Sequence, residues 1–178
     1  MTTARDEAGS IGDAAFVGDT LEGVVAALLT EKRLTLAVAE SCTGGLITDR
    51  LTDVPGSSVF LEGTAVTYSN LSKTELLGVP QEVIGKFGAV SRETASLMAE
   101  GVRRIGHTDL GLAATGIAGP SGGTDLKPVG TVFIALADGE KTICRDFLLA
   151  GERRRIKVFA SQQALIMLKK YLSGREHD

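Results

Sequence analysis

The sequence is poor in the residues from which metal sites and histidine-based catalytic sites are built. Its 178 residues include two histidines and two cysteines, and tryptophan is absent. Neither a pair of histidines at ligand spacing nor a Cys-x-x-Cys motif occurs, so we predict no metal ion and no other cofactor. The chain also has no run of about 18 apolar residues, which argues against a membrane-spanning helix.

An excess of positive charge is absent as well. There are 19 Lys and Arg residues against 22 Asp and Glu residues, which gives a formal net charge of −3. Because nucleic-acid binding depends on a basic surface that releases counterions, we do not expect nucleic acid to be a partner. The N-terminal segment lacks the charged-then-apolar order of a secretory signal, and Cys42 and Cys144 are expected to be free thiols. We therefore predict a cytoplasmic protein without membrane contact.

Length and patterning predict one folded domain. A chain of 178 residues buries enough apolar surface for one hydrophobic core but rarely for two. Residues 1–16 are polar, small and aperiodic, so we expect a disordered tail there. The folded domain is expected over residues 17–173, with a second short tail over residues 174–178.

Helical and strand patterns alternate along this domain. Helices are expected over residues 17–33, from residue 46 to Pro55, from Lys73 behind a capping box that starts at Ser72, from Ser91, and over residues 156–171. Strands are expected over residues 34–39, 59–69 and 110–117, and over the two arms of a hairpin, 130–137 and 142–149. The helix after Ser91 is expected to bury Ala95, Met98, Val102 and Ile105. The predicted fold class is α/β, with a mixed β-sheet covered by helices.

The segment Glu40-Ser41-Cys42-Thr43-Gly44-Gly45 joins a predicted strand to a predicted helix. In α/β sheets, binding and catalytic groups gather at the carboxyl ends of the strands, where Ser41 is expected to lie. Unpaired N–H groups at the start of the helix could stabilise an oxyanion or bind an anion there. Two alternatives remain open: Ser41 or Thr43 could simply cap the helix, and Cys42 could compete as nucleophile.

A nucleophilic serine needs a base, and the sequence offers lysine and tyrosine rather than histidine. His177 lies in the polar C-terminal segment and His107 in a predicted surface turn, whereas Tyr68 and Lys73 lie close together after a predicted strand. If Ser72 caps the next helix, the helix dipole lowers the pKa of Lys73, which is the direction that a base requires. The alternative is a solvated lysine beside a half-buried tyrosine.

Residues 119–128 contain three glycines and two prolines, which predicts a loop of fixed shape after the strand at 110–117. Successive backbone N–H groups of residues 115–123 could converge there on a phosphate or an oxyanion. The other interpretation is a flexible glycine-rich loop.

Five blocks of the sequence carry a resemblance to a known family. They are Ala39-Glu40-Ser41-Cys42-Thr43-Gly44-Gly45, Val66-Thr67-Tyr68-Ser69-Asn70 with Lys73, Gly88-Ala89-Val90-Ser91, Thr115-Gly116-Ile117-Ala118-Gly119-Pro120 with Gly122-Gly123, and Lys127-Pro128-Val129-Gly130-Thr131-Val132. Together they resemble the CinA C-terminal domain family over about residues 20–172. The resemblance is to the stand-alone form, without the molybdopterin-binding-like domain that some relatives carry.

This resemblance implies an amidohydrolase. Members of the family convert nicotinamide mononucleotide to nicotinate mononucleotide and ammonia, and the product returns to NAD synthesis. The family also suggests a homodimer or a higher homo-oligomer. The alternative function is a catalytically silent pyridine-nucleotide-binding module associated with competence or the DNA-damage response.

The resemblance also assigns residues. It makes Ser41 the nucleophile, Lys73 and Tyr68 the base, and Thr115 a further catalytic residue; how the proton is divided between Lys73 and Tyr68 is open. Thr115 and nearby main-chain donors would hold the amide oxygen or the ribose phosphate. The expected substrate-binding residues are Glu40, Thr43, Gly44, Gly45, Asn70, Gly116, Gly119, Gly122, Gly123, Lys127 and Arg153.

The basic segment after Gly151 departs from the family pattern. Relatives often carry a further arginine beyond Arg153, where this chain has Lys157. A lysine still neutralises a phosphate but lacks the bidentate geometry of arginine, so the departure bears on affinity. Arg153 to Arg155 could equally be a solvated start of a helix.

Overall fold

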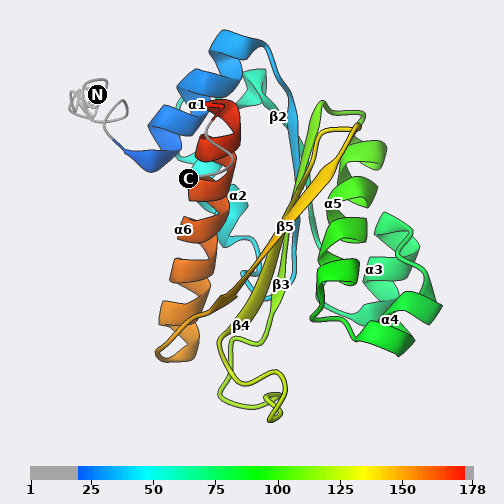
Figure 1. The fold of residues 1–178 in the computed structure, drawn as a ribbon. Coiled ribbons are helices and arrows are strands. Elements are labelled where there is room, and N and C mark those ends of the chain that lie inside the picture. Colours follow the sequence, from blue (N-terminus) through cyan, green and yellow to red (C-terminus); the bar gives the residue numbers. More distant parts are fainter. Residues whose placement is uncertain (1–19, 175–178) are drawn as a thin grey trace, which may run out of the picture.

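A five-stranded mixed sheet forms the centre of the molecule (Figure 1). The computed structural model describes residues 20–174, so the expected tail at 1–16 and the residues from 175 onward lie outside the described residues. The strands are β1 (Leu36–Glu40), β2 (Leu61–Val66), β3 (Leu110–Gly116), β4 (Thr131–Ala137) and β5 (Thr142–Leu148). Their order is β2-β1-β3-β4-β5; β2 and β3 are parallel to β1, β4 is antiparallel to β3, and β5 is antiparallel to β4. The predicted α/β fold with a mixed sheet is confirmed.

Helices cover both faces of this sheet (Figure 1). One face carries α1 (Leu21–Lys32), α2 (Leu46–Thr52) and α6 (Arg153–Leu172), and the other carries α3 (Asn70–Leu77), α4 (Gln81–Phe87) and α5 (Arg92–Gly106). A short 3-10 helix, η2 (Ser57–Val59), precedes β2. Within residues 20–174, no helix has both the length and the apolar composition that crossing a bilayer requires.

The two faces of the sheet differ in the size of their side chains. Leu36, Val38, Leu110 and Leu112 belong to the core under α1, α2 and α6. The residues that alternate with them and face α5 are small, among them Ala37, Gly111 and Ala113, so α5 approaches the strands closely. A Cβ built at Gly111 would lie 2.1 Å from the carbonyl oxygen of Ala99 in α5, which only a glycine in β3 permits.

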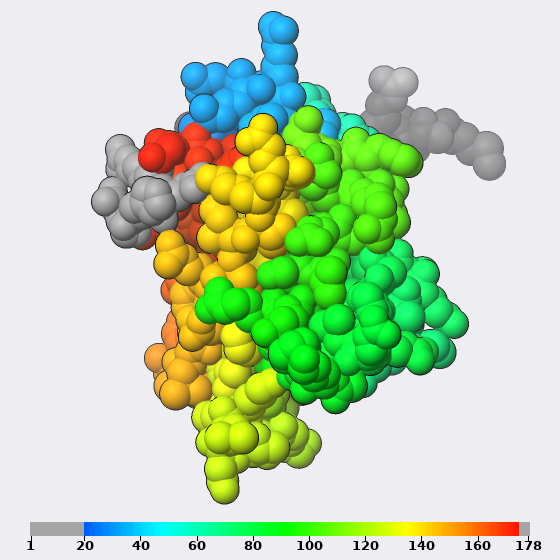
Figure 2. Space-filling view, turned by 45° about the vertical axis from the view of Figure 1, so that its right-hand side comes forward, coloured from blue at the N-terminus to red at the C-terminus, as the bar shows by residue number. Residues whose placement is uncertain are grey.

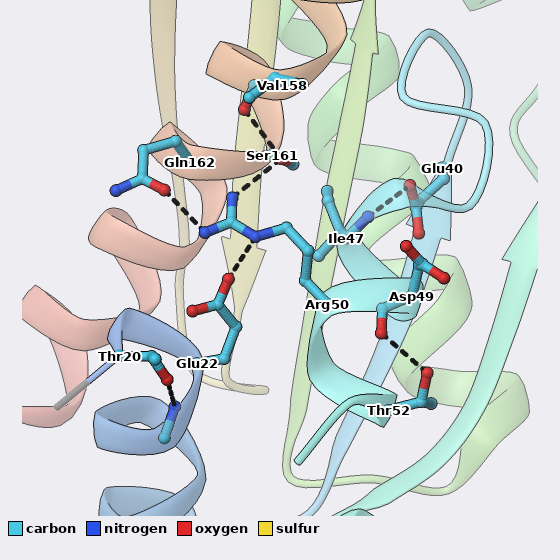
Figure 3. A network of polar contacts seen from close by, with 11 residues as sticks. Thr20, Glu22, Glu40, Ile47, Asp49, Arg50, Thr52, Val158, Ser161 and Gln162 are labelled. Atoms are coloured by element: carbon cyan, nitrogen blue, oxygen red, sulfur yellow. Dashed lines mark hydrogen bonds and ion pairs between the residues drawn. The ribbon is translucent and has the colours of Figure 1, made fainter. Parts of the chain in front are cut away.

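A polar network ties α2 to the two helices beside it (Figure 3). The guanidinium of Arg50 in α2 forms an ion pair with Glu22 of α1 and donates to Ser161 (2.9 Å) and Gln162 (2.7 Å) of α6. Because α2 follows directly from the turn that contains Ser41, this network also fixes the position of that turn.

Three expectations about helices need correction. The helix near Lys73 begins at Asn70 with Ser69 as its N-cap, and Ser72 is the reciprocal partner in the capping box rather than the cap. Ile105 is 48% exposed, because Val102 and Gly106, rather than Ile105, face the sheet at this end of α5. Helix α4 was not predicted, although Pro80 before it and Gly88 after it mark its ends.

Gly101 and Gly85 provide a matched test of the close packing of α5. Both are interior helical residues, but a Cβ at Gly101 would lie 2.2 Å from the carbonyl oxygen of Leu77, whereas one at Gly85 would meet nothing within 4 Å. We expect Gly101→Ala to lower the free energy of unfolding by about 1–3 kcal/mol, and Gly85→Ala to raise it by up to about 1 kcal/mol. Urea unfolding followed by circular dichroism measures both. Equal stabilities would contradict tight packing between α3 and α5.

Candidate active site

The carboxyl ends of three parallel strands meet at one edge of the sheet. Ser41 follows β1, Tyr68 follows β2, and Thr115 lies at the end of β3. The main-chain N–H of Ser41 donates to Ala114 O (2.9 Å), which continues the pairing of β1 with β3 beyond the end of β1. The ends of the strands therefore position these side chains, as is usual in sheets of this kind.

Lys73 and Ser41 form a buried hydrogen-bonded pair at this edge. The Nζ atom of Lys73 lies 3.0 Å from Ser41 Oγ and donates to Thr67 O at 2.7 Å. Lys73 is 1% exposed and Ser41 is 8% exposed. A neutral lysine can donate to the Thr67 carbonyl while its lone pair accepts the hydroxyl hydrogen of Ser41, so the geometry fits a serine nucleophile with a lysine base.

Burial is the chief cause that lowers the pKa of Lys73 below its ordinary value of 10.5. The direction agrees with the sequence-based expectation. That expectation, however, attributed the lower pKa to the dipole of a helix capped by Ser72, and the helix starts three residues earlier. Lys73 is the fourth residue of α3, and its side chain reaches back to the carbonyl of Thr67, before the helix begins.

Glu40 serves the turn rather than the cavity. Its carboxylate is fully buried and accepts hydrogen bonds from the main-chain N–H groups of Gly45 (3.0 Å), Ile47 (3.1 Å) and Thr48 (2.9 Å). It also accepts from the hydroxyl of Thr48 at 2.7 Å, and its bond to Ile47 is visible in Figure 3. Because these three N–H groups at the start of α2 already donate to Glu40, they are not free to bind a substrate oxyanion.

Cys42 is a poor nucleophile despite its place beside Ser41. Burial raises the pKa of the Cys42 thiol to about 12, so the thiolate is scarce near neutral pH. Its side chain packs in the core between the sheet and α2. Cys42 and Cys144 are both free, as predicted.

The Ser41–Lys73 pair opens into a cavity of about 310 Å3. Its walls come from the strand ends, the start of α3, the linker before α5, the loop after β3 and the start of α6. The lining residues are Ser41, Cys42, Tyr68, Asn70, Lys73, Ala89, Val90, Thr115, Gly116, Ile117, Ala118, Gly119, Ser121, Gly122 and Arg153. The loop at 119–130 extends past the end of the sheet and is visible at the bottom of Figures 1 and 2.

Tyr68 and Arg153 form a pair at the cavity rather than joining the buried dyad. The guanidinium of Arg153 donates to Tyr68 Oη (2.8 Å) and to Gly119 O (2.8 Å). Tyr68 is 62% exposed. The phenol thus faces the solvent side of the cavity, and Lys73 is the group in contact with Ser41 Oγ.

Thr115 and Lys127 donate to main-chain carbonyls at the end of α4 and in the linker between α4 and α5. Thr115 Oγ1 donates to Ala89 O (2.8 Å), and Lys127 Nζ donates to Phe87 O (2.8 Å) and Val90 O (2.7 Å). Thr115 still lines the cavity, but Lys127 does not. Five further residues expected to bind substrate, namely Glu40, Thr43, Gly44, Gly45 and Gly123, also lie outside the lining.

Comparison with known proteins identifies the family. The model of the CinA C-terminal domain matches residues 18–172. The chain belongs to the CinA C-terminal domain family. A CinA-like protein of Syntrophus aciditrophicus is 74% identical over 88% of this chain and 37% of that protein. Another, from Syntrophotalea carbinolica, is 50% identical over 88% of this chain and 38% of that protein. The chain thus spans less than two fifths of the length of these relatives.

Solved structures share this CinA domain fold. The competence damage-inducible protein A of Klebsiella pneumoniae superposes with a TM-score of 0.84 at 31% identity, over 86% of this chain and 95% of that chain. The competence/damage inducible protein CihA of Agrobacterium tumefaciens gives a TM-score of 0.81 at 37% identity over the same shares.

In this CinA domain, the sequence alone missed part of the cavity wall. Ala89 and Val90 line it without having been predicted to do so, whereas Ile117, Ala118 and Ser121 belong to the segment 115–123 that was expected to bind an anion through its main chain. The glycines around them, in Gly88-Ala89-Val90-Ser91 and in the loop after β3, were the available signal. Within residues 20–174, no three His, Cys, Asp or Glu side chains are grouped to hold a metal ion.

Glu40→Gln tests whether the buried carboxylate holds the turn that contains Ser41. Both oxygens of the Glu40 carboxylate accept hydrogen bonds from main-chain N–H groups. In glutamine one of these oxygens is replaced by an NH2 group, which cannot accept, so we expect the free energy of unfolding to fall by about 1–3 kcal/mol. Glu62→Gln, at an exposed position of β2, is the matched control and should change nothing. Equilibrium urea unfolding measures both variants. A Glu40→Gln protein as stable as the control would show that the turn is held by other contacts.

Proposed function

We propose that this CinA domain hydrolyses the carboxamide of nicotinamide mononucleotide to nicotinate mononucleotide and ammonia. The observation that carries the proposal is the buried contact of 3.0 Å between Lys73 Nζ and Ser41 Oγ at the cavity. A binding module needs donors for a phosphate but has no use for a serine hydroxyl held against a buried amine. The family resemblance supplies the substrate class.

The acylation half of the reaction uses the dyad. Ser41 Oγ attacks the carboxamide carbon while its proton passes to neutral Lys73. The tetrahedral intermediate then expels the nitrogen, which takes that proton from Lys73 and leaves as ammonia. The product of this half is an ester between Ser41 and the nicotinoyl group, with Lys73 neutral again.

Deacylation repeats the same proton transfers with water. Lys73 takes a proton from the water that attacks the ester carbonyl, and it returns the proton to Ser41 Oγ as the ester bond breaks. The acid is released as a carboxylate, and its proton goes to ammonia or to solvent. No redox step or external co-reactant is required.

Recognition of the nucleotide is assigned to the exposed side of the cavity. Arg153, the first residue of α6, offers a positive charge there and is held by Tyr68 Oη and Gly119 O. A guanidinium with a fixed plane suits a phosphate. The pyridine carboxamide would then extend inward to Ser41, with Asn70 and Gly122 on the walls between.

Ammonia release from nicotinamide mononucleotide tests the proposal. Wild type should turn over in the presence of a chelator, whereas Ser41→Ala and Lys73→Met should each lose at least about 1000-fold in kcat. Ser58→Ala and Lys169→Met, at exposed positions, are the controls and should retain activity. If the wild type binds the nucleotide without releasing ammonia, the silent binding module replaces the enzyme.

The pH dependence reports the environment of Lys73. Neutral Lys73 is the base, and burial lowers its pKa, so kcat/KM should rise with pH and level off with a midpoint below 10.5.

The same lowered pKa should make stability depend on pH. Unfolding restores the ordinary pKa of Lys73, so at pH values between the folded and the unfolded pKa the unfolded chain binds more protons than the folded one. The free energy of unfolding should therefore rise with pH across that window. Urea unfolding of wild type and Lys73→Met at several pH values isolates this contribution, which would be absent from the variant. A profile identical in both proteins contradicts a lowered pKa.

A further inference from the structure

The linker between α4 and α5 forms one wall of the cavity and has an unusual arrangement of main-chain groups. Ala89 and Val90 line the cavity together with Ser41, Lys73 and Thr115. Four consecutive carbonyl groups, those of residues 87–90, all accept hydrogen bonds from side chains of the protein.

The donors to these carbonyls come from two parts of the chain. The hydroxyls of Ser91 and Thr94, at the start of α5, donate to Gly88 O at 2.9 and 2.7 Å. Thr115 donates to Ala89 O, and Lys127 bridges Phe87 O and Val90 O. The carbonyl oxygens are thus directed toward the protein and satisfied there.

Peptide geometry fixes the direction of the N–H groups that follow. In a planar trans peptide the N–H points opposite to the preceding C=O. The N–H of Ala89 therefore points away from the hydroxyls that bind Gly88 O, and the N–H of Val90 points away from the Thr115 hydroxyl. Within the described residues, neither N–H has a hydrogen-bond acceptor.

Several main-chain donors close to the nucleophile are already used. The N–H of Ser41 donates to Ala114 O, and those of Gly45 and Ile47 donate to the Glu40 carboxylate. The start of α2, where the sequence suggested an oxyanion site, is therefore occupied. Cys42, Ala118 and Gly119 line the cavity, and their N–H groups are the competing candidates.

We propose that the main-chain N–H groups of Ala89 and Val90 stabilise the oxyanion that forms when Ser41 attacks a carbonyl, and that Lys127 is a positioning residue for them. The identity of the substrate as a nicotinamide nucleotide rests on the proposed function, whereas this assignment requires only that Ser41 is acylated. A cavity wall whose carbonyls are satisfied by the protein, while two of its N–H groups have no acceptor in the described part of the chain, suits an oxygen that gains negative charge. Lys127 thereby acts through the backbone, although the sequence suggested that it binds substrate.

Backbone ester substitution tests the two donors directly. Replacing Val90 or Ala89 by the corresponding α-hydroxy acid removes one N–H and keeps the side chain. The probe is p-nitrophenyl nicotinate, and the readout is the rate of Ser41 acylation by p-nitrophenolate burst and mass spectrometry. We expect a fall of about 100-fold in at least one of the two esters. An ester at Ser91 is the control. Like the other two esters it makes the carbonyl before it a weaker hydrogen-bond acceptor, but the N–H that it removes belongs to a residue outside the cavity lining. It should therefore have a much smaller effect on acylation.

The outcomes separate this inference from the proposed function. Wild-type-like acylation in both the Ala89 and Val90 esters overturns the inference, as does a loss seen only in a Cys42 ester. Absence of acylation in the wild-type protein overturns it as well. Acylation that depends on these N–H groups, without ammonia release from nicotinamide mononucleotide, would support the inference and reject the proposed substrate.

Lys127 is tested by the pattern of its kinetic effects. As a positioning residue, Lys127→Met should lower kcat roughly 10- to 100-fold with little change in KM, and equally for nicotinamide mononucleotide and nicotinamide riboside. Lys127→Arg should restore part of the rate. Lys86→Met is the matched control, because Lys86 is exposed on α4 with its ammonium over the Phe87 ring. A rise in KM for the mononucleotide alone would instead show that Lys127 contacts the phosphate.

Discussion

The buried amine of Lys73 constrains the geometry around it, because an amine removed from water must find hydrogen-bond partners inside the protein. It finds them in Thr67 O, at the end of β2, and in Ser41 Oγ, at the end of β1. The two strands are parallel neighbours, so the contact joins two chain segments that leave the sheet at the same edge. Burial also lowers the pKa of the amine, so the packing that places Lys73 also favours the neutral form that can accept a proton.

The turn that carries the serine is held by charge as well as by packing. Glu40 is buried beneath it and replaces the water that would otherwise solvate the first N–H groups of α2. On the far side of α2, Arg50 connects to Glu22 and Ser161 on the neighbouring helices (Figure 3). Polar groups outside the cavity lining therefore help to determine where Ser41 lies.

Much of the fold followed from local patterns in the sequence. The hairpin expected from the arms at 130–137 and 142–149 and the N-cap at Ser91 are present as predicted, because turn chemistry and capping are decided by neighbouring residues. The start of α3 was misplaced by three residues, since Ser69 and Ser72 are both good caps and their reciprocal hydrogen bonds select Ser69. Helical spacing alone predicted that Ile105 is buried, but it is exposed, because burial depends on which elements the folded chain places beside each side of the helix.

The sequence by itself determined the layered α/β architecture, the strand-to-helix turn that contains Ser41, and lysine and tyrosine rather than histidine as the candidate bases. Only the tertiary structure decided which polar groups face the cavity. Glu40 and Lys127 stand beside glycine-rich motifs in the sequence, but their side chains bind the protein's own main chain. The physical reason is that a side chain's partners are chosen among groups brought close by folding, from distant parts of the chain, and no local pattern encodes that choice.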